Sequence, residues 1–106
     1  MYPGFCGAST LIASFGDAAT EALFHGAGGK AVRRIPTDIR SVAERKLDML
    51  NAATELNDLR APPGNRLEAL KGDLKGKHSI RVNDQWRVLF RWQAGDAHDV
   101  EIIDYH

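Results

Sequence analysis

The sequence contains little cysteine and no long apolar stretch. Cys6 is its one cysteine, which excludes an intramolecular disulfide and any metal site built from several cysteines. No apolar run approaches the roughly 18 to 20 residues that a membrane-spanning helix requires. The start of the chain lacks the positively charged region that precedes the apolar part of a signal peptide. We therefore expect the protein to work in the cytoplasm.

The sequence also lacks net charge, since 14 Lys and Arg balance 14 Asp and Glu. That balance by itself argues against a nucleic-acid partner. The charges are nevertheless segregated, because residues 60–91 hold an excess of five positive charges and residues 93–106 contain acids but no Lys or Arg. Such a segment can form an anion-binding surface, although a charged segment is more often a solvated face. Its basic members are Arg60, Arg66, Lys71, Lys75, Lys77, Arg81, Arg87 and Arg91.

The first third of the chain predicts a strand, a short helix and a loop. The apolar run "LIASF", residues 11–15, is typical of a short strand. Asp17 offers an N-cap for the helix "AATEALFH", and Gly26 offers a residue that ends it. The following "GAGGKAVRRIP" is rich in glycine and stops at a proline, which indicates a loop. It is not a phosphate-binding P-loop, because the GK[ST] ending and the preceding strand are missing.

Residues 38–54, "DIRSVAERKLDMLNAAT", have the clearest periodicity and predict an amphipathic helix. The apolar residues that recur at helical spacing are Ile39, Val42, Ala43, Leu47 and Leu50. The helix begins just after Pro36, or four residues later if Ser41 and Glu44 form a capping box. The segment "APPG", residues 61–64, ends the helical half of the chain.

After residue 64 the hydrophobic period changes to two, which is typical of strands. In "HSIRV" and "WRVLFRW" most apolar residues share one face, and the arginines lie on the other. Burying Ile80 and Val88 on the same face requires an odd number of residues in the intervening turn. That register places Arg81 opposite Arg87.

The same reasoning across "QAGDAHD" pairs Phe90 with Ile102 and Trp92 with Val100. In that register Arg91 lies opposite Glu101, and Arg87 lies opposite Tyr105. The expected result is a row of three side chains across three strands, on the face away from the main apolar cluster: Arg81, Arg87 and Tyr105. A slip of one residue in the second hairpin removes this row.

Two arginines placed directly opposite each other repel, so the pair is expected to bind an anion. A phosphate fits, because each guanidinium can bind phosphate oxygens through paired N–H groups. Cleavage of RNA by its own 2′-hydroxyl requires cations on the phosphate, a base and an acid. Candidates for the phosphate are Arg81, Arg87 and Lys71, and candidates for proton transfer are Asp104, Tyr105 and His106. Taken singly, these are also ordinary solvated or terminal residues, so spacing alone leaves the function open.

Three segments together carry a resemblance to a known family: "ERKLDMLNAATELNDL", "RLEALKGDLKGKHSIRVNDQWRVLFRW" and "EIIDYH". They are similar to the HigB-type toxins, or plasmid-maintenance killer proteins, of the RelE/ParE superfamily. The ordered combination of L-K-G-D, S-I-R-V-N-x-x-W-R and D-Y-H is specific. The resemblance extends from Ile12 to His106, so we expect one domain over residues 1–106, with residues 1–10 as an N-terminal extension outside the family pattern.

The resemblance implies an α+β fold, in which two N-terminal helices pack on a curved, mainly antiparallel sheet of four or five strands. It implies a type II toxin that acts as a ribosome-dependent mRNA endonuclease without metal or organic cofactor, and that inhibits translation and growth. The implied partners are a HigA-type helix-turn-helix antitoxin and, through it alone, operator DNA. Matching catalytic positions are Lys71, Arg81, Arg87, Asp104, Tyr105 and His106. The residues expected to contact RNA or the ribosome are Arg66, Lys75, Lys77 and Arg91.

Glu68 departs from the family pattern, because family members often have histidine at this position. A carboxylate can still act as a base, but it repels phosphate and cannot donate a proton as an imidazolium does. Two alternatives therefore stay open. One is a ParE-like inhibitor that binds a protein such as DNA gyrase without cutting RNA, although the Asp-Tyr-His ending disfavours it. The other is a weakened toxin that acts mainly by binding its antitoxin.

Overall fold

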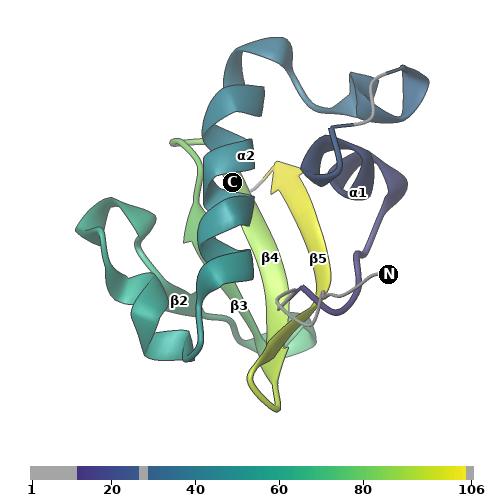
Figure 1. Ribbon diagram of the computed structural model, residues 1–106. Coiled ribbons are helices and arrows are strands. Elements are labelled where there is room, and N and C mark those ends of the chain that lie inside the picture. Colours follow the sequence, from purple (N-terminus) through teal and green to yellow (C-terminus); the bar gives the residue numbers. More distant parts are fainter. Residues whose placement is uncertain (1–11, 27–28, 105–106) are drawn as a thin grey trace.

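The computed structural model describes residues 12–26 and 29–104. These residues form a four-stranded antiparallel sheet with two α-helices on one of its faces (Figure 1). The expected α+β architecture is therefore confirmed. Residues 1–11, Tyr105 and His106 lie outside the described residues. No helix in the described part of the chain is long and apolar enough to cross a membrane.

The first helix, α1, spans Ala18–Phe24 and begins where the sequence predicts. The Asp17 carboxylate accepts a hydrogen bond of 3.0 Å from the Thr20 backbone N–H, which caps the helix. Gly26 follows the end of the helix at a φ of 74°. The loop expected after it is partly wrong, because Lys30–Arg34 forms a 3₁₀ helix. The reason is burial, since Val32 in this turn and Ile35 after it both enter the core.

The second helix, α2, spans Thr37–Ala52, so it begins directly after Pro36. The alternative start at Ser41 is wrong. The predicted apolar stripe faces the sheet, and its buried members are Ile39, Ala43, Leu47 and Leu50. Two 3₁₀ turns, Leu56–Arg60 and Pro63–Asn65, connect the helix to the sheet.

The four strands are β2 (Glu68–Ala69), β3 (Lys77–Arg81), β4 (Trp86–Gln93) and β5 (Asp96–Asp104), and they lie side by side in that order. A loop with a 3₁₀ turn at Gly72–Leu74 joins β2 to β3. Arg81 pairs with Arg87 and Ile80 with Val88, which confirms the predicted register of the β3–β4 hairpin.

The predicted register of the β4–β5 hairpin is wrong, by two residues from Trp86 to Leu89 and by three next to the turn, where Trp92 pairs with Ala97 rather than with Val100. Ile102 pairs with Val88 rather than with Phe90, and Ile103 pairs with Arg87 in the place expected for Tyr105. Likewise, Glu101 lies opposite Leu89 and not opposite Arg91. The row of Arg81, Arg87 and Tyr105 therefore does not form as predicted.

Two local features, the turn that precedes β5 and a bulge within β5, cause this difference in register. Ala94 and Gly95 form a two-residue turn in which both φ angles are positive, at 54° and 83°, so Gln93 pairs directly with Asp96. A bulge then lies between Leu89 and Arg91, where two residues of β5, Asp99 and Val100, stand against one residue of β4. Asp99 has a φ of 54°, which is typical of such a bulge.

The apolar run at residues 11–15 does not form the expected strand within its described part. Ile12 and Phe15 instead make isolated parallel bridges to Ala97 and Val100 of β5. Gly16 allows this close approach, because a Cβ there would lie 2.8 Å from a Glu101 carboxylate oxygen. The pairing covers the outer edge of β5, which would otherwise expose unpaired backbone groups.

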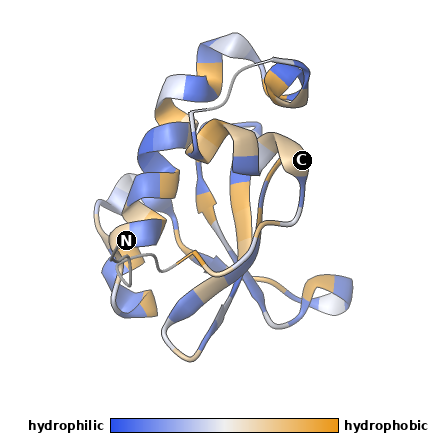
Figure 2. Ribbon diagram, turned by 45° about the vertical axis from the view of Figure 1, so that its right-hand side comes forward, coloured by the Kyte–Doolittle hydropathy of each residue, from blue (hydrophilic) through white to orange (hydrophobic). Residues whose placement is uncertain are grey.

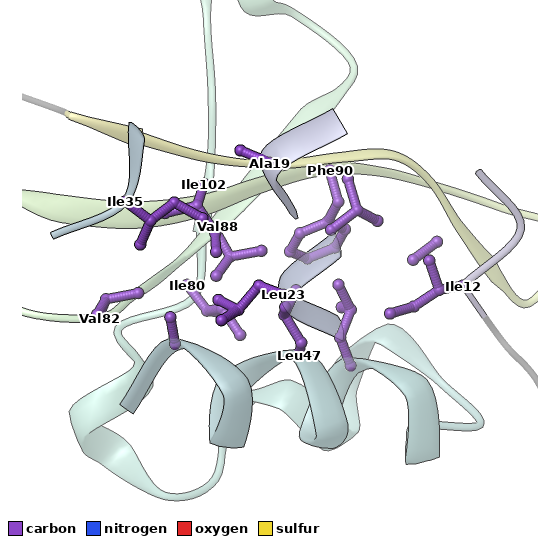
Figure 3. Packing of buried hydrophobic residues seen from close by; sticks show 14 of the residues in the cluster. Ile12, Ala19, Leu23, Ile35, Leu47, Ile80, Val82, Val88, Phe90 and Ile102 are labelled. Carbon is purple, nitrogen blue, oxygen red and sulfur yellow. The ribbon is translucent and has the colours of Figure 1, made fainter. Parts of the chain in front are cut away.

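The core lies between the two helices and the sheet (Figure 3). Residues from all the main elements meet there, including Leu23 of α1, Leu47 of α2 and Phe90 of β4. Hydrophobic and hydrophilic residues alternate along the ribbon rather than forming separate blocks (Figure 2). Each element therefore contributes one face to the core and leaves the other for contacts with solvent or a ligand.

We expect Phe90→Ala to lower the free energy of unfolding by about 3 to 5 kcal/mol, because it removes a fully buried ring at the centre of the core. Urea denaturation of the wild type and the variant measures this change. Gln93→Ala, at an exposed position of the same strand, is the control. A loss in Phe90→Ala no larger than in Gln93→Ala would contradict this description of the core.

Candidate active site

Arg87 lies at the centre of the sheet face that points away from the helices, and its side chain is held in place. The side chain is only 11% exposed. Its Nε donates a hydrogen bond of 2.7 Å to the Ser79 hydroxyl, and its Nη2 donates one of 2.7 Å to the Arg66 backbone carbonyl. The Glu68 carboxylate lies 3.7 Å from the same Nη2. Arg87 is therefore a fixed cation and not a mobile surface side chain.

Arg87 also forms the floor of a shallow depression with a cavity volume of about 340 Å³. The other lining residues are Arg66, Leu67 and Glu68, from β2 and the turn that precedes it. Two arginines and one glutamate therefore line an open hollow. A phosphate group could bind there if its oxygens compete successfully with Glu68.

Arg81 lies opposite Arg87 across the β3–β4 pair, as the sequence predicts. The two guanidinium groups have different partners, because Arg81 forms an ion pair with Asp84 in the turn between the strands. The Asp84 side chain is 97% exposed, so this ion pair is in contact with water and contributes little stability. Arg81 can therefore exchange Asp84 for a phosphate at low cost.

The end of β5 carries Asp104, the last described residue of the expected catalytic group. Asp104 lies opposite Trp86 and accepts a hydrogen bond of 2.9 Å from the Gln85 side-chain amide. Alternation along β5 points its side chain toward the helix side of the sheet, whereas Arg87 points to the other side. The structure thus brings Arg81 and Arg87 together but does not bring Asp104 onto their face. Tyr105 and His106 lie outside the described residues.

The other predicted basic residues lie in the β2–β3 loop, on the β3–β4 pair and at the depression itself. Lys71 and Lys75 are exposed in the loop between β2 and β3. Lys77 pairs with Arg91 across the β3–β4 ladder, and the Arg91 guanidinium lies 3.0 Å from the Asp99 carboxylate. Arg66 adopts a left-handed conformation with a φ of 45° at the rim. These residues extend the basic surface beyond the two central arginines.

Ser79 belongs to the site and was missed by the sequence analysis. It is fully buried and occupies the position of β3 that lies opposite Leu89, next to Arg87. Its hydroxyl accepts the Arg87 Nε–H bond and so fixes the direction of the guanidinium. Alternation alone could have found it, because Ser79 shares a face with Arg81.

A second depression, of about 300 Å³, lies across β2 from the first, on the helix side of the sheet edge. His78 is one of its lining residues and stacks on Phe90 with the ring centroids 6.0 Å apart. The His78 Nδ1 is buried without a hydrogen-bond partner. Burial lowers the pKa of His78 below its ordinary value, because the imidazolium loses hydration there.

Within residues 12–26 and 29–104, no group of three or more His, Cys, Asp or Glu side chains is arranged to hold a metal ion. The depression beside Arg87 is lined by two arginines and one glutamate, and a guanidinium group is suited to binding an anion.

Comparison with known proteins supports the resemblance noted in the sequence. A family model described as the RelE-like toxin of type II toxin-antitoxin system HigB matches residues 13–106. Toxin HigB-1 of Vibrio cholerae serotype O1 is 53% identical over 68 residues, which cover 64% of this chain and 72% of that protein. Endoribonuclease HigB of Proteus vulgaris is 36% identical over 69 residues, covering 65% of this chain and 73% of that protein. An uncharacterized protein of Haemophilus influenzae is 38% identical over 78 residues, which cover 74% of this chain and 76% of that protein.

The α+β fold and the matching family model define a RelE-like toxin of a type II toxin–antitoxin system. Within that class, the chain belongs to the HigB family. A toxin of this kind has an antitoxin as its partner.

We expect wild-type protein to lose stability relative to His78→Phe as the pH falls from about 7.5 to about 5. Burial lowers the pKa of His78 in the folded state, whereas in the unfolded chain the imidazole has its ordinary pKa of about 6.5. The unfolded state therefore binds more protons below about pH 6.5, and acidification favours it. Phenylalanine keeps an aromatic ring beside Phe90 but does not titrate. Urea denaturation at several pH values measures the difference, and parallel pH profiles for the two proteins would contradict the burial of His78.

Proposed function

We propose that this toxin is an endoribonuclease that cuts mRNA on the ribosome and so inhibits translation and growth. The observation that carries the proposal is the fixed, outward-facing Arg87 beside Arg81 and an open depression of about 340 Å³. The name of the Proteus vulgaris relative, Endoribonuclease HigB, supports the same activity. The site would work in the cytoplasm, where transcripts are translated.

The proposed reaction is attack by an RNA 2′-hydroxyl on the adjacent phosphorus, with departure of the 5′-oxygen of the next nucleotide. Arg87 and Arg81 bind the phosphate and stabilise the negative charge that grows on its oxygens. Lys71, in the loop after β2, adds a third cation. Tyr105 and His106 are proposed to supply the base that takes the 2′ proton and the acid that protonates the leaving oxygen. Asp104, expected from the sequence to share this role, points to the other face of the sheet and is not assigned a proton transfer. Arginine keeps its proton during the reaction, so the two arginines cannot act as acid or base. The proton transfers are therefore assigned to residues at the end of β5.

The proposed partners follow from the charge of the same face. Ribosomal RNA and mRNA are polyanions, and Arg66, Lys75, Lys77 and Arg91 form the basic surround that would contact them. The antitoxin is proposed to be a HigA-type helix-turn-helix protein, and the toxin would meet operator DNA through it alone. Neither a metal ion nor an organic cofactor takes part in the proposed reaction.

A weakened toxin is the second candidate, because Glu68 lies 3.7 Å from the Arg87 guanidinium. A carboxylate there repels the incoming phosphate and partly neutralises the cation that must bind it. In this reading the protein still binds its antitoxin, but it cuts RNA slowly.

Primer extension on a defined mRNA tests the proposed activity, with and without translating ribosomes. We expect cuts with wild-type protein only when ribosomes are present. We expect His106→Ala and Arg87→Lys to cut at least about 100-fold more slowly, as is typical when a proton-transfer group or a charge-stabilising donor is lost. Circular dichroism confirms that both variants fold. Growth arrest by wild-type protein without any cut transcript would favour an inhibitor that binds a protein target such as gyrase.

We expect Glu68→Gln to tighten binding of a short RNA in which the reactive 2′-hydroxyl is replaced by 2′-O-methyl. Removing an exposed charge beside Arg87 is worth about 1 kcal/mol or less, which corresponds to a gain of up to about fivefold. Fluorescence anisotropy measures the affinity. Asp48→Asn removes an exposed charge from α2, on the opposite side of the sheet, and is the control. If Glu68 is instead the catalytic base, Glu68→Gln will abolish cleavage of the unmodified RNA.

A further inference from the structure

A buried polar pair joins helix α2 to the turn that leads into the site. Lys46 of α2 is 9% exposed, and Asn65, at the end of the 3₁₀ turn Pro63–Asn65, is fully buried. The Lys46 ammonium donates a hydrogen bond to the Asn65 side-chain oxygen. Neither residue belongs to the apolar stripe of α2 or to the basic face of the sheet. The pair therefore has no role in the reaction as proposed above.

Asn65 uses the rest of its side chain to hold the chain that folds around it. Its amide group donates hydrogen bonds of 3.1 Å to the Leu59 carbonyl and 3.3 Å to the Ala61 carbonyl. Its backbone N–H donates one of 2.9 Å to the Pro62 carbonyl. A single buried amide thus ties together the two 3₁₀ turns between α2 and β2, and Lys46 fixes the orientation of that amide.

The next residue along the chain is a partner of Arg87. Arg66 has a φ of 45°, and its backbone N–H donates to the Pro63 carbonyl at 3.1 Å. That left-handed turn directs its carbonyl toward the sheet, where it accepts the 2.7 Å hydrogen bond from Arg87 Nη2. The position of this carbonyl depends on the turn that Asn65 holds. The path from Lys46 to Arg87 therefore consists of two hydrogen bonds, Lys46–Asn65 and Arg66–Arg87, joined by the peptide bond between Asn65 and Arg66.

A lysine is a costly choice at the Lys46 position if packing is its only purpose. Burial lowers the pKa of Lys46, and the positive charges of Arg45 and Arg81 lower it further. An apolar side chain of similar length would avoid this cost and is often at least as stable in such a place. A lysine at this position is explained if its hydrogen bond to Asn65 holds the turn that precedes Arg66 and so helps to position Arg87.

We propose that Lys46 and Asn65 are positioning residues for Arg87, acting through the Arg66 carbonyl on the direction of its guanidinium. This inference rests on the proposed function, in which Arg87 binds the reacting phosphate. Misplacement of such a group by about 1 Å can cost up to about 100-fold in rate, even when the altered residue never touches the substrate.

The first test follows the Arg87 side chain without any RNA. The Nη–H signals of Arg87 in a ¹H–¹⁵N spectrum are assigned by their loss in Arg87→Lys. We expect their hydrogen exchange to be at least about tenfold faster in Lys46→Met and Asn65→Ala than in the wild type, because Nη2 loses the Arg66 carbonyl as a fixed partner. Thr20→Val is the matched control. It removes a fully buried hydroxyl that accepts from the Ile102 backbone N–H at 2.9 Å, near the other edge of the sheet.

The second test measures ribosome-dependent cleavage in the same variants, below the melting temperature of each. We expect Lys46→Met and Asn65→Ala to lower kcat by about tenfold with little change in KM. Adding Lys46→Met or Asn65→Ala to Arg87→Lys should lower kcat no further, because the guanidinium that the pair positions is already absent. Thr20→Val should keep the kcat of the wild type. Any change in kcat that it does cause should add in full to that of Arg87→Lys in the double variant.

Two results would overturn the inference. One is unchanged Arg87 exchange in both Lys46→Met and Asn65→Ala. The other is a loss of kcat that Thr20→Val reproduces at equal loss of stability, since that would make the pair purely structural. Failure of the wild type to cut RNA would overturn the proposed function instead, and the exchange measurement would still decide whether Lys46 and Asn65 position Arg87.

Discussion

The pairing of β3 with β4 places Ile80 against Val88 on one face of the sheet and Arg81 against Arg87 on the other. Because side chains alternate along a strand, this one register decides both what the helices cover and what the solvent side presents. A shift of one residue would bury the arginines and expose the core. The hydrophobic contact with α2 therefore fixes the basic face as firmly as it fixes the core.

The basic face is held by partners of two kinds. Backbone and hydroxyl groups hold Arg87, so its direction is set before any ligand arrives. Carboxylates balance the charge of the arginines, as Glu68 does near Arg87 and Asp84 does at Arg81. The first kind of partner can stay in place when a phosphate binds, whereas the second kind competes with it. The protein thus carries no net charge and still presents an oriented cation.

The β4–β5 hairpin shows where prediction from sequence fails. The expected loop "QAGDAHD" is in fact a two-residue turn at Ala94 and Gly95, followed by strand. Alanine seldom adopts a positive φ, so the sequence gives no clear signal for that turn. The bulge at Asp99 then lets Ala97 and Val100 both reach the core, although they are three positions apart. Neither irregularity changes the hydrophobic pattern enough to be recognised beforehand.

The sequence by itself determined the helices at residues 18–24 and 37–52, the β3–β4 register and the family, because capping residues, hydrophobic period and motif order are local properties of the chain. Only the tertiary structure decided that Ser79 and the Arg66 carbonyl hold Arg87, and that Lys46 and Asn65 hold the turn before Arg66. These contacts join residues that are from 8 to 21 positions apart, through side chains whose neighbours depend on how the whole chain packs. No local pattern encodes such distances, because they follow from the packing of α2 and the connecting turns against the sheet.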